Sequence, residues 1–326
     1  MTNNMRPLVL ALFTSLLCTS PIAAKEFQVG LLTPGPISDN GWNAGAYEGL
    51  MKIKKELGAK VSHVQVRSPA EHEEHFRSYG EDGFDLVFGH GFEFQDAARR
   101  VGRDFPDTYY VTTSGNTVTK NVGAIVFELE QATYLLGRLA AEMSKTGTIG
   151  MIGGMEIPSV ESTFIAFEAG AKSVKPDCTV LRTYIGSWED NALAREATLA
   201  QINRGADFIF HNADAAGLGV FQAVEESKDK GVYAFGSNKN QNGEAPEVIL
   251  ASAVIDIPSA LLSVAKKVQA GEYEAGVTRF DLGSGIISLE INPKLKDRIP
   301  DEVLKDLDSV QAEIISGKTE VPRGDF

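Results

Sequence analysis

Short apolar runs alternate with longer amphipathic stretches along the chain from residue 27 onward. The short runs are rich in β-branched residues, as strands are, whereas the longer stretches repeat apolar residues at helical spacing. This alternation predicts βαβ units around parallel sheets. The units fall into two successive series, so we predict two doubly wound α/β lobes.

The first series predicts strands at residues 28–32, 60–66, 86–89 and 109–113, with helices at 42–57, 70–79 and 94–104. The second opens with a helix at 133–144. It continues with strands at 149–153, 179–184, 208–211, 232–236 and 248–254, and with helices at 160–174, 191–204 and 217–228. Gly58, Gly205 and Gly231 follow predicted helices, where glycine accepts the left-handed conformation that closes a last turn.

The last part of the chain is predicted to cross between the lobes. We expect a helix at 258–270 and a strand near 280–282 to belong to the first lobe. We expect residues 285–317 to cross back to the second lobe. No low-complexity linker separates the series, so the hinge should consist of several short segments. We predict a first lobe of residues 25–127 and 256–283, and a second of 128–255 and 284–326.

Residues 1–24 have the layout of a secretory signal peptide: a polar start with Arg6, an apolar run and a small-residue end at Ala24. The apolar run, roughly 11 residues, is shorter than the ~20 needed to span a bilayer. The competing interpretation is a lipoprotein acylated at Cys18. However, Leu17 stands where that peptidase prefers a small residue. We therefore predict cleavage after Ala24 and a periplasmic protein.

Composition narrows the possible partners. The chain without residues 1–24 keeps 44 acidic and 30 basic residues, a net charge of −14. Such a surface disfavours nucleic acid and anionic membranes as partners. Only Cys178 remains outside the leader, so no intrachain disulfide is expected, and the histidines show no metal-ligand spacing. We predict no metal or other cofactor.

Ligands of open parallel sheets sit beyond the carboxyl ends of the strands. The loop after the first strand carries Asp39, Trp42 and Asn43 at a helix start. A loop of the second lobe carries Trp188, the only other tryptophan. Two such rings could grip a flat heterocycle from opposite sides. The alternatives are that Asp39 or Asn40 only caps the helix and that the tryptophans are separate packing residues.

Other loops after predicted strands add polar or aromatic side chains. They contribute Gly91, Phe92, Asp214, Asn238 and Lys239 as candidate ligand contacts, although ordinary turn chemistry would explain the same residue types. His211 is at least as well explained as a core histidine. No nucleophile–base pair, Gly-x-Ser-x-Gly motif or dinucleotide fingerprint occurs in these loops. The sequence therefore favours binding over catalysis.

Several motifs, in order, resemble the basic membrane protein family of periplasmic type I solute-binding proteins, which includes purine nucleoside receptors. They are Asp-Asn-Gly-Trp-Asn at 39–43, Gly-His-Gly-Phe at 89–92, Tyr-Leu-Leu-Gly at 134–137, Gly-Ser-Trp-Glu-Asp at 186–190 and Gly-Ala-Asp at 205–207. The resemblance spans residues 27–315. It implies a periplasmic binding protein type I fold whose lobes close on a purine base or nucleoside.

By this resemblance, Trp42 takes the place of a stacking aromatic, Asn43 that of its polar neighbour, and Glu130 that of a group reading the base edge. Trp188 is the candidate for the opposite face. One departure concerns the sugar, because Asn238 and Asn240 stand where the family usually has aspartates. An amide offers fewer acceptors to vicinal hydroxyls than a carboxylate. This favours a free base, or a differently substituted ring, over a ribonucleoside.

The resemblance implies a monomeric receptor that delivers a small molecule to an ABC permease after hinge closure. A periplasmic sensor serving a membrane signalling protein would use the same fold and closure. A nucleoside-processing enzyme is a third alternative, disfavoured by the missing catalytic constellation. The sequence leaves the exact ligand open.

Overall fold

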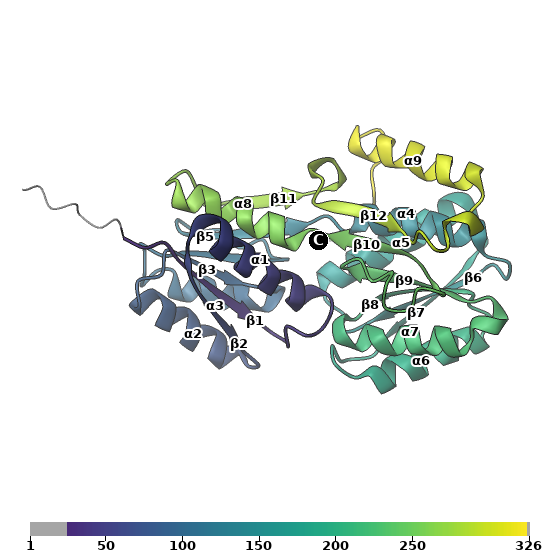
Figure 1. Cartoon of the computed structure of the whole chain (residues 1–326), viewed down its shortest axis with the longest axis horizontal. Helices are drawn as coiled ribbons and strands as arrows, with labels where there is room; N and C mark the ends of the chain where they lie inside the picture. Colours follow the sequence, from purple (N-terminus) through teal and green to yellow (C-terminus); the bar gives the residue numbers. More distant parts are fainter. Residues whose placement is uncertain (1–24, 325–326) are drawn as a thin grey trace, which may run out of the picture.

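The computed structural model describes residues 25–324, and the predictions for the leader at residues 1–24 fall outside the described residues. The described chain forms two α/β lobes side by side along the long axis of the molecule (Figure 1). A six-stranded sheet forms the centre of each lobe. The predicted fold class is therefore confirmed. Within residues 25–324, no helix combines the length and apolarity needed to cross a bilayer.

The first sheet is entirely parallel and has the order β11-β5-β4-β3-β1-β2. Its strands are β1 (Gln28–Thr33), β2 (Lys60–Gln65), β3 (Leu86–Gly89), β4 (Tyr109–Thr113), β5 (Val122–Phe127) and β11 (Val277–Phe280). Helices α1 (Trp42–Leu57) and α8 (Ile257–Gln269) cover one face, and α2 (Pro69–Glu81) and α3 (Gln95–Val101) the other. Successive strand residues serve opposite faces: Leu31 packs with the first helix pair and Leu32 with the second.

The second sheet has the order β12-β10-β9-β8-β6-β7. Its strands are β6 (Thr148–Gly153), β7 (Thr179–Tyr184), β8 (Phe208–Asn212), β9 (Tyr233–Asn238), β10 (Ile249–Ile255) and β12 (Ile287–Ile291). Helices α4 (Glu130–Met143) and α5 (Pro158–Val174) pack on one face, and α6 (Asn191–Asn203) and α7 (Gly217–Glu226) on the other. Glycine permits the close α4–α5 contact, because a Cβ on Gly137 would lie 1.9 Å from the Phe167 carbonyl oxygen.

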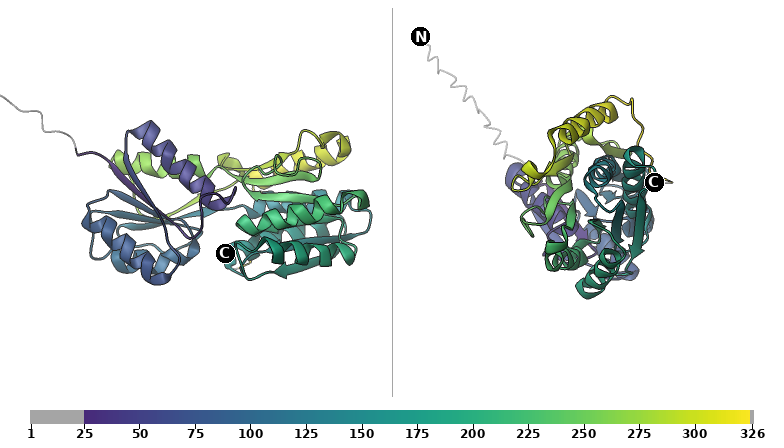
Figure 2. Two further views of the ribbon diagram at one scale, coloured as in Figure 1. Left: turned by 60° about the horizontal axis from the view of Figure 1, so that its bottom comes forward. Right: turned by 90° about the vertical axis from the view of Figure 1, so that its right-hand side faces the viewer.

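The chain passes between the sheets three times, from β5 to α4, from β10 to α8 and from β11 to β12. Figure 2 shows the narrow region where these segments join the lobes. The largest apolar cluster includes residues of α8 and of α4, so core packing continues across this junction. On this topology we propose the lobe boundaries stated above, residues 25–127 with 256–283 and 128–255 with 284–326.

Three elements differ from the sequence prediction. Strand β5 was not predicted, although β3 and β8, which are equally buried along their whole length, were. The strand expected near residues 280–282 lies earlier, as β11, and a 3-10 turn (Leu282–Ser284) follows it. The final segment forms β12, which pairs antiparallel with β10, and α9 (Asp301–Ile315), which packs on α4.

Candidate ligand-binding site

A cavity that is partly open to solvent is lined by residues of both lobes. The first lobe contributes Pro34, Trp42, Gly91, Phe92, Glu93, Ser114 and Phe127. The second contributes Leu129, Ile157, Ser159, Val160, Thr163, Trp188, Asn212, Asp214, Asn238 and Ile255. Nearly all of these residues lie at or just beyond the carboxyl end of a strand, where ligands bind in open parallel sheets.

Trp42, the first residue of α1, is held in place by a buried histidine. The His90 ring stacks on the indole with centroids 4.0 Å apart and an interplanar angle of 23°. His90 Nε2 donates to the Trp42 carbonyl oxygen (3.0 Å), and Nδ1 accepts from Thr113 Oγ1 (3.1 Å). Burial lowers the pKa of His90 to about 3, so the ring is neutral and can donate and accept at once. His90 therefore fixes the orientation of Trp42 from one face.

Trp188 approaches the cavity from the second lobe, in the loop between β7 and α6. Its ring packs on Gly154, where an added Cβ would lie 2.2 Å from the indole. Its carbonyl oxygen accepts from the Ala216 amide (2.9 Å) and so ties the loop to the residues that follow Asp214. The two tryptophans, far apart in sequence, line one cavity from different lobes.

Several residues with an unfavourable backbone conformation lie at or near this cavity. Four non-glycine residues of the described chain have positive φ: Asn40 (51°), Ser114 (58°), Asp214 (47°) and Asn238 (65°). Ser114, Asp214 and Asn238 line the cavity, and the Asn40 carbonyl oxygen accepts from Gln241 Nε2 of the other lobe (3.5 Å). Such conformations cost of order 1 kcal/mol or more each and tend to occur at functional sites.

Amides and carboxyls supply most of the polar lining. Asn238 Nδ2 lies 3.5 Å from Asn212 Oδ1 and 3.4 Å from Asp214 Oδ1, and Asn212 Nδ2 donates to Thr163 Oγ1 (3.3 Å). Burial, and then the charges of Asp39 and Glu93, raise the pKa of Asp214 well above its usual value. Burial likewise raises the pKa of Glu93, although part of its surface is open to solvent. Among the described residues, no lysine, arginine or histidine lines the cavity.

Asp39, Asn43 and Lys239 were predicted as ligand contacts but do not line the cavity. The Asp39 carboxylate accepts from the amides of Gly41 (3.1 Å), Asn43 (2.7 Å) and Ala44 (2.8 Å), so it caps α1, as the alternative interpretation stated. Asn43 Nδ2 donates to the same carboxylate (2.9 Å). This pair positions the Trp42 turn rather than the ligand.

Lys239 instead joins the two lobes. Its Nζ lies 2.7 Å from Oε1 of Glu48 on α1, and both side chains are exposed. A lysine in this ion pair points across the junction and not into the cavity. It can stabilise the arrangement of the lobes without touching a ligand.

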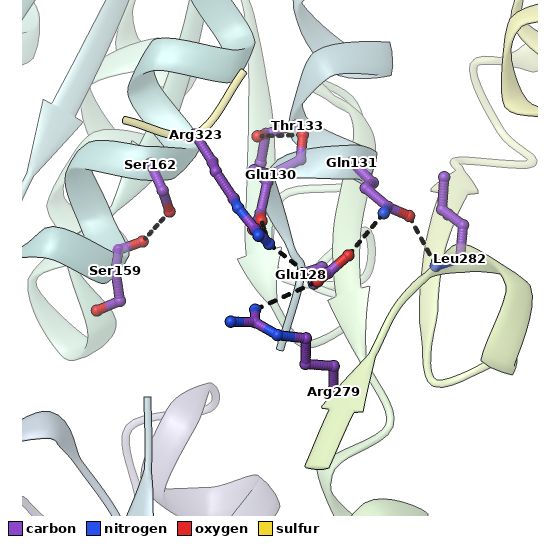
Figure 3. Close-up of polar contacts among 9 residues, drawn as sticks. All are labelled: Glu128, Glu130, Gln131, Thr133, Ser159, Ser162, Arg279, Leu282 and Arg323. Carbon is purple, nitrogen blue, oxygen red and sulfur yellow. Dashed lines mark hydrogen bonds and ion pairs between the residues drawn. The ribbon is translucent and has the colours of Figure 1, made fainter. Parts of the chain in front are cut away.

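Glu130 lies in a charged cluster where the crossing segments meet (Figure 3). Neighbouring Glu128 pairs with Arg279 (3.4 Å) from β11 and with Arg323 (2.9 Å) from the end of the chain. Glu130 is 2% exposed, lies 3.6 Å from Arg323, and has one oxygen without a hydrogen-bond partner. Burial is the main cause that raises the pKa of Glu130 to about 7. The structure places this residue in the hinge, outside the cavity.

Sequence reasoning missed the lining residues Glu93, Ser114, Ser159, Thr163 and Asn212. Glu93 and Ser114 follow β3 and β4, Asn212 ends β8, and Ser159 and Thr163 lie in the first turns of α5. Their nearness to strand ends was the available signal. Loops after strands also hold many residues that only form turns, however, and pattern alone does not separate the two. Among residues 25–324, no group of three or more histidine, cysteine or acidic side chains is placed to hold a metal ion.

Two lobes of this topology around a shared cavity define the periplasmic binding protein class. A solute-binding protein from Aeropyrum pernix shares the fold with a TM-score of 0.85 at 20% identity, covering 92% of this chain and 94% of that one. A transcriptional activator of the comK gene from Bacillus halodurans has a TM-score of 0.76 at 27% identity, covering 90% and 99%.

The family model described as ABC transporter substrate-binding protein PnrA-like matches residues 27–325, and the chain belongs to this family. A nucleoside-binding protein of an ABC transporter from Lactococcus lactis is 28% identical, covering 93% of this chain and 91% of that protein. A purine-binding protein from Brucella abortus is 27% identical, covering 91% and 83%. Basic membrane protein A1 from Borrelia garinii is 30% identical, covering 90% and 88%.

Proposed function

We propose that this substrate-binding protein takes up a purine base or nucleoside-like heterocycle outside the cytoplasm and delivers it to an ABC permease. The ring lies between Trp42 and Trp188, and the amide and carboxyl groups of the cavity bind its edges. The observation that carries the proposal is that two indoles from different lobes line one cavity. The names of the Lactococcus and Brucella relatives support the same ligand class.

The polar lining favours a free base over a ribonucleoside. Asn238 lines the cavity, whereas Asn240 Oδ1 accepts from the Asn242 amide (3.1 Å) and serves the local turn. One amide in place of two carboxylates gives few acceptors for vicinal ribose hydroxyls. We therefore expect adenine or another base to bind more tightly than its nucleoside.

Closure of the lobes on the ligand is the proposed mechanism. A ligand that contacts both tryptophans stabilises the closed arrangement by those contacts alone, because only differential affinity shifts a conformational equilibrium. The Lys239–Glu48 ion pair and the Gln241–Asn40 contact add direct links between the lobes. The permease then recognises the closed form.

Thermal unfolding of the mature protein with purine bases and nucleosides tests the ligand class. A ligand at 100 times its dissociation constant adds about 2.7 kcal/mol to the stability of the protein. We expect stabilisation by at least one base and none by sugars or amino acids at equal concentration. No stabilisation by any purine compound would overturn the assignment.

A sensory role is the second candidate, because one relative of known structure is described as a transcriptional activator. Both roles need the same cleft, and they differ in the partner of the closed protein. Reconstituted uptake of radiolabelled base with the cognate permease would support transport. Product formation from a nucleoside incubated with the protein would instead revive the enzyme alternative.

A further inference from the structure

Two carboxyl groups of the cavity have no cation partner. Glu93 follows β3 in the first lobe, and Asp214 follows β8 in the second. Neither forms an ion pair with any described lysine, arginine or histidine, although 17 ion-pair contacts occur elsewhere among the described residues. Glu128, Glu130 and Asp306 each have an arginine partner, whereas these two acids have none among the described residues.

The third acid near the cavity has a different role. Asp39 accepts three amide hydrogen bonds and one from Asn43, so its carboxylate is already satisfied. Asp214, in contrast, has only a long contact of 3.4 Å from Asn238 Nδ2. Its backbone is held at φ 47°, a conformation uncommon for aspartate, and the residue lines the cavity. Glu93 and Asp214 therefore retain unused hydrogen-bonding capacity toward a ligand.

Burial raises the pKa of both groups, and the Glu93 charge adds to the effect on Asp214. Two carboxyls that repel each other in a low-dielectric cleft are stabilised by hydrogen-bond donors or by positive charge. A ligand can supply either. A phosphate placed there would instead add negative charge beside both acids, and an oxygen acceptor would pair only with a protonated carboxyl, which has a single O–H donor.

We propose that Glu93 and Asp214 are the specificity-determining pair of the cleft, and that they select amino-substituted heterocycles over oxo-substituted and phosphorylated ones. The inference rests on the proposed function and deepens it by naming the ligand subclass. An exocyclic amine offers two N–H donors to carboxyl oxygens. A ring carbonyl at the same position offers only lone pairs.

Isothermal titration calorimetry with adenine, hypoxanthine and adenosine 5′-monophosphate tests the pair. For the unmodified mature protein we expect adenine to bind at least 10-fold more tightly than hypoxanthine, with the nucleotide weaker still. Asp214→Asn and Glu93→Gln keep the shape but add amide donors. Each variant should bind adenine more weakly and hypoxanthine more tightly than the unmodified protein does. The ratio of adenine affinity to hypoxanthine affinity should therefore fall by at least 5-fold.

Glu189→Gln is the matched control, because Glu189 is an exposed acid next to Trp188 that does not line the cavity. Its affinity ratio should equal that of the unmodified protein. If purines bind but neither cleft variant changes the ratio, the pair proposal is wrong and the proposed function stands. If no purine binds any of these proteins, both are wrong. Unfolding curves without ligand check that each variant is folded.

Discussion

The cavity and the hinge each contain two acidic side chains, but they differ in whether the chain supplies a cation to those acids. At the hinge, Glu128 and Glu130 meet the guanidinium groups of Arg279 and Arg323. In the cavity, Glu93 and Asp214 pair with no guanidinium group of residues 25–324. Burying an acid costs free energy unless a partner compensates it. At the hinge, arginines of the same chain compensate the acids. In the cavity, a bound ligand would have to supply the hydrogen-bond donors or the positive charge.

The hinge and the cavity also differ in their internal contacts and in their backbone conformation. The hinge cluster joins three segments, because Gln131 donates to Glu128 (2.8 Å) and accepts from the Leu282 amide (3.0 Å) while Arg323 brings in the end of the chain (Figure 3). The cavity instead collects left-handed non-glycine residues. The cavity therefore combines left-handed backbone with acids that lack a cation partner, whereas the hinge combines charge pairs with the buried Glu130.

The largest effect should come from the cavity tryptophans. Replacing Trp42 and Trp188 together with alanine removes both stacking surfaces, each worth about 1–3 kcal/mol for a heterocycle. We expect at least a 100-fold loss of affinity for the base that binds the unmodified protein, measured by calorimetry. The double phenylalanine variant keeps two rings and should lose much less. Unchanged affinity of the alanine variant would disprove the sandwich.

The next effect concerns the pH dependence of stability at the hinge. The folded pKa of Glu130 is about 7 against 4.5 for the free side chain, so the folded state favours the protonated form. Stability from this group is therefore present below pH 4.5 and is lost as the pH rises to 7, by roughly 3 kcal/mol at most.

Urea unfolding of the unmodified protein and of Glu130→Gln at pH 5 and pH 8 isolates this contribution. We expect the two proteins to have similar stability at pH 5 and the glutamine variant to be more stable at pH 8. If the difference in unfolding free energy between the two proteins is the same at pH 5 and pH 8, Glu130 does not titrate in this range.

A smaller effect is expected from the arginines of the hinge. Arg323 faces the buried Glu130 as well as Glu128, whereas Arg279 pairs with Glu128 alone. Arg323→Gln should lower the free energy of unfolding by about 1–2 kcal/mol, because it leaves a buried acid without a cation. Arg279→Gln, the matched control, should change it by less than about 1 kcal/mol. A larger loss for Arg279→Gln would reverse this ranking.

The smallest effect is expected where the lobes meet at the surface. Glu48→Gln removes the exposed ion pair with Lys239, which is worth about 0.2–1 kcal/mol. We expect a two- to five-fold weaker ligand affinity at low salt that disappears at high salt, because salt screens exposed charges. An effect that persists in 1 M salt would point to a role other than charge pairing.

The sequence by itself determined the order of elements and the class of fold. Alternating β-branched runs and amphipathic stretches locate most strands within a few residues, because burial of one face imposes a period on each element. It missed β5, although it located β3 and β8, which are just as fully buried. It also named both tryptophans, Asp214 and Asn238, because ligand-facing loops follow the carboxyl ends of parallel strands.

Only the tertiary structure decided which polar residues of those loops reach the cavity. Asp39 and Glu130 have the same chemistry as Asp214, yet one caps α1 and the other lies in the hinge. Which side chain has a partner depends on residues distant in sequence, such as Arg323 for Glu130 and Glu48 for Lys239. Local patterns encode burial and turns, whereas charge compensation is a property of the folded chain.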